Sequence, residues 1–271
     1  MIGNPLQTRP SDPSLVDDGV VFSDSVVVRP DAVNADRRIK FDGIARHLQN
    51  AGQDHLAASG HEQTHPHWIA RRTVIELQRS GGWPERLSLH RWCSRMGSRW
   101  CNIRIDLDGD AGTSVKTEAF WINFNVDTGT PSRLGDDFTD KFGSTAEPGP
   151  LRWKPWLDTS PDPAATAVPF LLRAVDVDFV QHVNNAVYWS ALEEALSQYP
   201  DLEGKLPVRA VIEHNTQLTL ADSPRLLAYR DGDRLLVWIM VGDRNVASMA
   251  VETGDGDVVR DSLAWGSVRC D

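Results

Sequence analysis

The stretch Asp178-Phe-Val-Gln-His182-Val-Asn184-Asn185 sets a carboxylate, an imidazole and two amides directly before an apolar helical pattern. Positions 187, 191, 192, 195 and 196 are apolar and recur at helical spacing, which predicts a helix over 184–199. The first N–H groups of a helix lack partners within it and carry a partial positive charge. A carboxylate beside them could activate water while they hold a developing oxyanion. The structural alternative is a capped helix, with Asn184 or Asn185 as the cap and a hydrogen-bonded surface histidine.

The segments around this stretch follow the same order twice. In each half a β-rich segment precedes one long helix, and strands separated by Gly-containing turns follow it, which favours antiparallel neighbours. The first half is predicted to contain a helix over 40–58 and strands over 20–29, 68–78, 86–95, 99–108 and 114–126. The second half is predicted to contain strands over 170–177, 209–220, 225–230, 234–242, 245–252 and 261–268.

A short repeat supports an internal duplication. Thr73-Val-Ile-Glu76 and Ala210-Val-Ile-Glu213 each lie in a predicted strand, at an offset of 210 − 73 = 137 residues. One long helix against a curved antiparallel sheet, present twice, gives the fold class α+β. We therefore predict a loose lead-in over 1–19, a first domain over 20–129, a linker over 130–167 and a second domain over 168–271. The linker contains Trp153 and Trp156, so part of it is expected to pack across the body of the protein.

Composition excludes several classes of function. The chain of 271 residues has 38 acidic and 28 basic residues and a net charge of −10, which argues against a nucleic-acid binder. No apolar run approaches the ~20 residues of a membrane-spanning helix, and residues 1–18 lack the pattern of a signal peptide. Three cysteines without a CxxC motif, and no histidine cluster with metal-ligand spacing, predict a cytoplasmic protein without a metal site.

The pattern Asp178-x-x-x-His182-Val-Asn184-Asn185-x-x-Tyr188, followed by glutamate, resembles the signature of hotdog-fold thioesterases. The duplication, together with Phe120-Trp-Ile-Asn-Phe-Asn125 and the Arg133-Leu134 step after it, is similar to the acyl-acyl carrier protein thioesterases of plants and bacteria. The resemblance covers about 20–252. It implies two tandem hotdog domains, each a long helix wrapped by a curved antiparallel sheet.

The resemblance also implies roles for individual residues. Asp178 and His182 fall on the catalytic pair, and Asn184, Asn185 and Tyr188 on positions that bind substrate. The plant enzymes carry an asparagine two residues before the histidine and a Glu-Cys pair on the next strand. The corresponding residues here are Val180, Gln217 and Leu218, which leaves Gln217 to hydrogen-bond water or the carbonyl. If that alignment slips, Glu213 becomes the candidate carboxylate, with a surface strand position as its alternative role.

The first half aligns Asp36 with Asp178 and Lys40 with His182, so apart from Asp36 it lacks the reactive set. The resemblance implies that such a half supplies the acyl-chain pocket, here with Phe41 and Trp121 among its residues, although core packing would produce the same apolar pattern.

We therefore expect an enzyme of fatty acid biosynthesis that hydrolyses fatty acyl thioesters and needs no cofactor. The expected partner is acyl carrier protein, with CoA as the alternative carrier, and the chain is expected to be a monomer or a homodimer. Val180 and Gln217 leave open a non-hydrolytic acyl-binding or sensor protein. A hotdog dehydratase fits less well, because the His-Val-Asn-Asn element is not part of its pattern.

Overall fold

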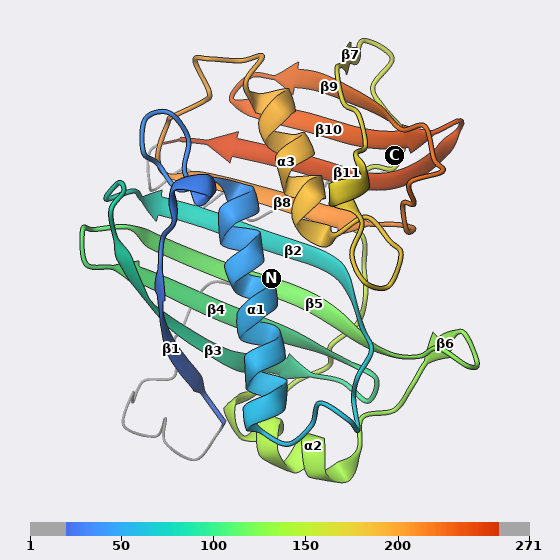
Figure 1. Ribbon diagram of the computed structural model, residues 1–271. Helices are drawn as coiled ribbons and strands as arrows, with labels where there is room; N and C mark the ends of the chain where they lie inside the picture. The colour runs from blue at the N-terminus through green and yellow to red at the C-terminus, as the bar shows by residue number, and fades with distance from the viewer. Residues whose placement is uncertain (1–19, 255–271) are drawn as a thin grey trace.

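The computed structural model describes residues 20–254, which form an antiparallel sheet with two long helices on one face (Figure 1). The first half contains β1 (Phe22–Val27), the 3-10 helix η2 (Pro30–Ala32), α1 (Phe41–Ala58), β2 (Trp68–Arg79), β3 (Arg86–Met96), β4 (Trp100–Gly109) and β5 (Ser114–Asn125). Between the halves lie β6 (Thr130–Pro131), α2 (Asp136–Phe142), η3 (Gly143–Thr145) and β7 (Thr166–Val168). The second half contains η4 (Ala174–Asp176), α3 (Asn185–Leu196), β8 (Val208–His214), β9 (Arg225–Asp231), β10 (Arg234–Val241) and β11 (Arg244–Thr253).

The strand order is β1-β3-β4-β5-β2-β8-β11-β10-β9-β7, and the short β6 pairs with β5. Helix α1 lies across the strands of the first half and α3 across those of the second (Figure 1). Each helix buries one face against the sheet. Ile44 and Ala45 are buried in α1, and Leu192 is buried in α3; each large apolar side chain removed from water contributes roughly 1.5–3 kcal/mol. The predicted α+β class is confirmed.

The two halves join at the β2–β8 pair, where the register places Arg72 opposite Glu213 and Glu76 opposite Arg209. Two ion pairs follow, Arg72–Glu213 and Arg209–Glu76, each with a shortest distance of 2.6 Å. At the offset of 137 residues that supports the predicted duplication, Arg72 corresponds to Arg209 and Glu76 corresponds to Glu213. Each half therefore supplies the arginine of one ion pair and the glutamate of the other.

The predicted packing of the linker tryptophans is confirmed at this seam. The backbone N–H of Trp156 donates to Glu213 at 2.9 Å, and the Arg72 guanidinium lies 3.6 Å from the centroid of a Trp156 ring. Trp153 also lies under Arg72, at 4.7 Å. The segment therefore covers one of the two ion pairs of the seam.

Three details of the predicted secondary structure are wrong. The predicted strand 170–177 is instead irregular chain and η4, because the Asp176 carboxylate accepts the Arg173 N–H at 2.8 Å and closes a turn. The predicted strand 209–220 ends at His214, and the Asp222 carboxylate then fixes a turn by accepting the Thr219 N–H at 2.8 Å. Helix α2 lies inside the predicted linker, and its seven residues are too few for a clear apolar period.

The predicted strand 261–268 lies outside the described residues. Within 20–254, no helix is both long enough and apolar enough to cross a membrane. The domain limits at 130 and 168 stay a prediction.

Candidate active site

The loop before α3 is closed by its own backbone and by Asp178. The Asp178 N–H donates to the His182 carbonyl at 2.9 Å, and the Gln181 N–H donates to the Asp178 carbonyl at 3.0 Å. Asp178 Oδ1 accepts the N–H groups of Val180 at 3.1 Å and His182 at 3.4 Å. Gln181 adopts φ 64°, in the left-handed region, which lets the chain turn back within four residues. One carboxylate oxygen thus organises the loop.

Both side chains of the predicted catalytic pair are half-buried in this loop. No hydrogen bond joins Asp178 Oδ2 or the His182 ring to another described residue. Both groups are therefore available to a substrate or to water. The two side chains lie in the same loop. Within residues 20–254, no hydrogen bond joins the Asp178 carboxylate to the His182 ring.

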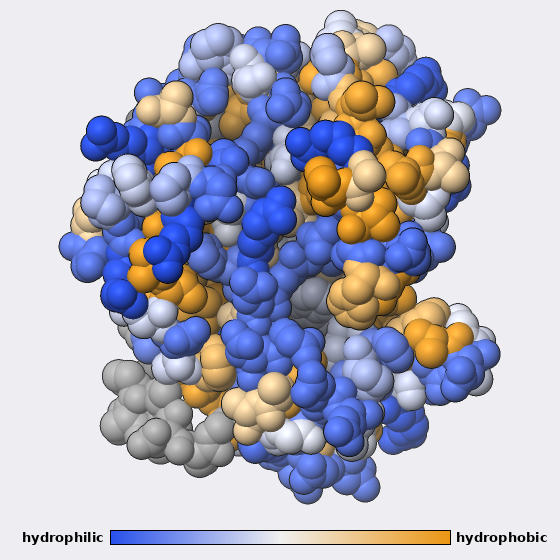
Figure 2. Space-filling view, viewed as in Figure 1, coloured by the Kyte–Doolittle hydropathy of each residue, from blue (hydrophilic) through white to orange (hydrophobic). Residues whose placement is uncertain are grey.

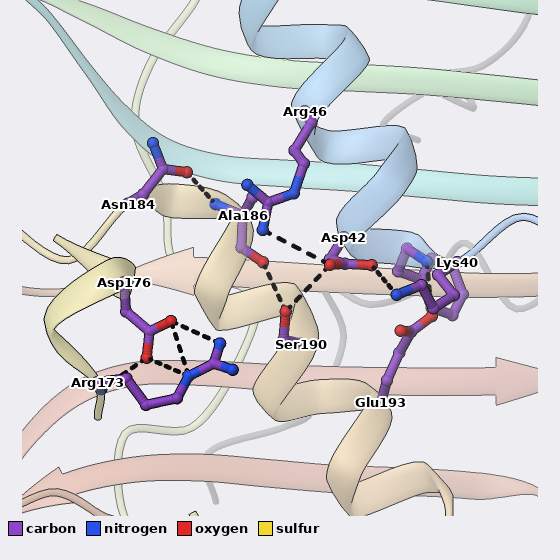
Figure 3. Close-up of polar contacts among 10 residues, drawn as sticks. Lys40, Asp42, Arg46, Arg173, Asp176, Asn184, Ala186, Ser190 and Glu193 are labelled. Atoms are coloured by element: carbon purple, nitrogen blue, oxygen red, sulfur yellow. Dashed lines mark hydrogen bonds and ion pairs between the residues drawn. The ribbon is translucent and has the colours of Figure 1, made fainter. Parts of the chain in front are cut away.

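Helix α3 begins with one capped N–H and one free N–H. Asn184 is the cap: its Oδ1 accepts the Ala186 N–H at 2.9 Å (Figure 3). The Asn185 N–H donates to no residue within 20–254. The capping role that the sequence left open between the two asparagines thus belongs to Asn184, and Asn185 keeps a free donor at the helix end.

The loop before α1 has the same backbone, at an offset of 144 residues. Asn34 Oδ1 accepts the N–H groups of Asp36 at 3.1 Å and Arg38 at 2.9 Å, and the Asn34 N–H donates to the Arg38 carbonyl at 2.9 Å. Arg37 adopts φ 64°, as Gln181 does. The predicted alignment of Asp36 with Asp178 is therefore wrong by two residues.

Asn34 corresponds to Asp178, and Arg38 corresponds to His182. Because the first half has no carboxylate and no imidazole at these positions, the conclusion that it lacks the reactive set becomes stronger.

The equivalent helix end of α1 is occupied. Glu193 of α3 reaches across and accepts the Phe41 N–H on Oε1 at 2.6 Å. Around it, Asp42 accepts a hydrogen bond from Ser190 at 3.3 Å and lies 3.5 Å from the Lys40 ammonium (Figure 3). Burial raises the pKa of Glu193 to about 7, against the opposing effect of the Phe41 N–H.

At the corresponding position of α1, 144 residues earlier, stands Gln49, which lines a cavity together with Asn185. Neither Gln49 nor Glu193 is among the predicted site residues, because the motif does not include Gln49 and assigns no role to the glutamate that follows Tyr188. Their equal spacing of eight residues from Phe41 and Asn185 is the signal that could have found them.

The cavity runs under α1 from the start of α3 to the strands of the first half. At the α3 end it is lined by Asn185 and Trp189, and at the far end by Arg91 of β3. Its remaining lining is mostly apolar and comes from α1, β2, β4 and β5: Ala45, Leu48, Gln49, Gly52, Ala70, Thr73, Ile103, Ile105, Thr117, Ala119 and Trp121. A mostly apolar cavity with a few polar groups is typical of a ligand site.

The predicted substrate-binding residues divide into two groups. Trp121 and Asn185 line the cavity. Phe41 and Tyr188 are buried behind it: Phe41 stacks on Trp189 at 5.8 Å, and Tyr188 packs edge-on against His214 at 4.7 Å. Burial raises the pKa of Tyr188 far above its usual range, so its hydroxyl stays protonated.

The two predicted polar residues after α3 occupy different environments. Gln217 is exposed, and its side chain hydrogen-bonds to neither Asp178 nor His182 among the described residues. Its neighbour Leu218 holds the reactive loop, since the Leu218 carbonyl accepts the Val183 N–H at 2.9 Å. Glu213 is fully buried in the seam, which contradicts the expected surface position and explains its ion pair with Arg72.

Apolar side chains surround the loop on the outside. Leu171, Val175 and Phe179 are 82%, 81% and 94% exposed. Figure 2 shows hydrophobic side chains gathered beside α3 on this face of the molecule. Within the described residues, no group of three or more His, Cys, Asp and Glu side chains could hold a metal ion.

Comparison with known proteins agrees with this geometry. Residues 19–142 match the Acyl-ACP thioesterase N-terminal domain, and residues 160–223 match the Acyl-ACP thioesterase C-terminal domain. The chain belongs to the acyl-ACP thioesterase family. Membership makes it a thioester hydrolase, and the predicted family is confirmed.

The chain has relatives at different levels of sequence identity. An uncharacterised protein of Mycobacterium tuberculosis is 39% identical over 226 residues, covering 83% of this chain and 89% of its own length. The chloroplastic oleoyl-acyl carrier protein thioesterase of Coriandrum sativum is 25% identical, over 89% of this chain and 72% of its own.

Solved structures share the fold. A putative oleoyl thioesterase from Lactobacillus plantarum superimposes with a TM-score of 0.73 at 13% identity, over 89% of this chain and all of its own. The 12:0-ACP thioesterase from Umbellularia californica superimposes with a TM-score of 0.69 at 18% identity, over 86% of this chain and 96% of its own. The predicted hotdog fold is confirmed.

Proposed function

We propose that this acyl-ACP thioesterase family member hydrolyses fatty acyl thioesters carried by acyl carrier protein and releases the free fatty acid. The names of its plant relatives support this carrier, and CoA thioesters are the alternative. The observation that carries the proposal is the free Asn185 N–H beside the cavity, within one short loop of Asp178 and His182. We also propose that the enzyme acts in fatty acid biosynthesis in the cytoplasm.

The proposed reaction places the acyl chain in the cavity and the thioester carbonyl at the start of α3. Asp178 takes a proton from water, which attacks the carbonyl carbon; direct attack by the carboxylate is the alternative. The Asn185 N–H and His182 hold the oxyanion of the tetrahedral intermediate. Its collapse breaks the C–S bond, the protonated Asp178 returns its proton to the leaving sulfur, and the acid and the carrier thiol leave. Gln217 is proposed as an outer hydrogen-bonder to water or carrier.

The test measures thiol release from matched acyl-acyl carrier protein and acyl-CoA substrates. Asp178→Ala should lower the rate at least ~100-fold, the scale of losing a general base. Asn34→Ala is the matched control, because it removes the same two loop hydrogen bonds in the half that lacks the reactive pair. Retained activity in Asp178→Ala, or binding of thioesters without any thiol release, would contradict the proposal.

A further inference from the structure

The far end of the cavity contains a buried cation. Arg91 lies on β3, on the face of the sheet that α1 covers, and is 9% exposed. It lines the cavity together with the apolar side chains of Ile103 and Ile105. A guanidinium in an apolar acyl-chain pocket is costly unless something accepts its hydrogen bonds.

The described protein provides little compensation for this charge. The Arg91 Nη1 atom lies 2.5 Å from His55 Nδ1, and no described carboxylate lies within ion-pair distance of the guanidinium. Burial lowers the pKa of Arg91 to about 10, so the group remains protonated at neutral pH. The neighbouring Cys93 thiol does not neutralise it, because a hydrogen bond with Cys101 and burial raise the pKa of Cys93. By contrast, Arg104 on the neighbouring strand β4 has Glu118 as an ion-pair partner.

The position of Arg91 fits the remote part of an acyl chain. Asn185 lines the cavity together with Ala70 and Thr73 of β2, whereas β3 stands three strands away in the order β2, β5, β4, β3. Three strand spacings of about 4.8 Å make roughly 14 Å, the length of about ten extended methylenes. A chain whose carbonyl lies at Asn185 would therefore bring its distal carbons to the guanidinium.

We propose that Arg91 selects acyl chains that carry an oxygen acceptor in their distal part, a hydroxyl or a carboxylate. Such an oxygen accepts hydrogen bonds that a plain hydrocarbon chain would leave unmade. Sites built around buried polar groups discriminate strongly against analogues that lack the matching group. This inference rests on the proposed thioesterase function and specifies its substrate class.

The test compares thioesters of equal chain length, around ten carbons, that are unsubstituted, ω-hydroxylated or ω-carboxylated. The native enzyme should show at least about tenfold higher kcat/KM for one or both oxygenated chains, and the two arms tell hydroxyl from carboxylate. Arg91→Met should remove that preference and raise activity on the unsubstituted chain, whereas Arg91→Lys should keep it. Thermal unfolding checks that each variant is folded.

Equal kcat/KM for all three chains in the native enzyme, or an unchanged preference in Arg91→Met, would overturn the inference while leaving the thioesterase function intact. If Arg91→Met does not fold, the comparison in the native enzyme decides. If no thioester is hydrolysed, the proposed function fails, and calorimetric binding of ω-hydroxy against unsubstituted free fatty acid decides the role of Arg91. Equal affinity for the two acids would then overturn it.

Discussion

The loops before α1 and α3 have the same backbone and opposite chemistry. In both, one side-chain oxygen accepts two N–H groups, one residue takes a left-handed φ of 64°, and a helix starts at the same distance. The oxygen belongs to an amide in the first loop, Asn34, and to a carboxylate in the second, Asp178. The loop fold therefore does not require an ionisable group, and the proposed catalytic role gives a reason for the carboxylate at 178.

The N-termini of the helices that follow these loops also differ between the halves. Glu193 occupies the Phe41 N–H at the start of α1, whereas the Asn185 N–H at the start of α3 is left free beside the cavity. The two halves thus contain equivalent helix ends, of which one is filled by the protein itself. The comparison supports the proposal that the second half holds the reacting carbonyl, while the first half supplies most of the cavity wall.

The two ion pairs at the β2–β8 seam also differ between the halves, and this difference predicts the largest effect on stability. Glu213 accepts from Arg72 and also from the N–H groups of Trp156 and Leu157, whereas its counterpart Glu76 accepts from Arg209 and Gln78. Glu213→Gln should lower the free energy of unfolding by about 3–5 kcal/mol, because it leaves the Arg72 charge buried and unpaired. Glu76→Gln should cost less. Urea unfolding measures both, and an equal or reversed loss would contradict the covering role of the 151–157 segment.

The occupied helix end predicts a dependence of stability on pH. Folded Glu193 has a pKa raised to about 7 from the ordinary 4.5, so folding favours its protonated form. Its contribution is therefore fully present below about pH 4.5 and is lost as pH rises through 7, by on the order of 3 kcal/mol. Glu193→Gln, which still accepts the Phe41 N–H, should flatten that slope. The charged groups facing it are Asp42, Lys40 and Arg38.

Chemical unfolding at several pH values makes this measurement. Exposed Glu194→Gln is the control and should keep the native slope. Identical slopes for the native protein and Glu193→Gln would show that the carboxyl does not hold its proton in the fold.

A carboxylate at the N-terminus of α3 should accept the free Asn185 N–H, as Glu193 accepts the Phe41 N–H at the start of α1. Gln49 stands where Glu193 stands in the other half, so Gln49→Glu should place a carboxylate on the Asn185 N–H. Losing one donor to the oxyanion corresponds to a decrease in kcat of about 100-fold. Gln49→Ala leaves that N–H free and should lower kcat by no more than about tenfold.

The pH profile separates this mechanism from simple damage to the site. The defect of Gln49→Glu should shrink at low pH, where the new carboxyl is protonated, and that of Gln49→Ala should not change. Higher activity in Gln49→Glu than in Gln49→Ala would break the proposed equivalence of the two helix ends.

Much of the fold followed from local patterns. Alternating strands and the apolar stripes of α1 and α3 predicted both helices and nearly all strands, because side-chain periodicity reflects one buried face. The errors fell where single polar contacts override propensity: Asp176 turns an apolar segment into η4, and Asp222 ends β8 early. The first-half alignment slipped by two residues because the side chains of the loop diverged while its hydrogen bonds did not.

By itself, the sequence determined the family and the place of the loop before α3, because Asp178, His182 and Asn184 make their hydrogen bonds within a few residues of themselves. Only the tertiary structure decided which helix N–H is free, since the group that closes the other one comes from 152 residues away in the chain. Only the tertiary structure also showed that Gln49 and Arg91, which belong to the first half, line the same cavity as Asn185 of the second half. Contacts across a duplicated fold depend on how the two halves pack, and no local pattern records that packing.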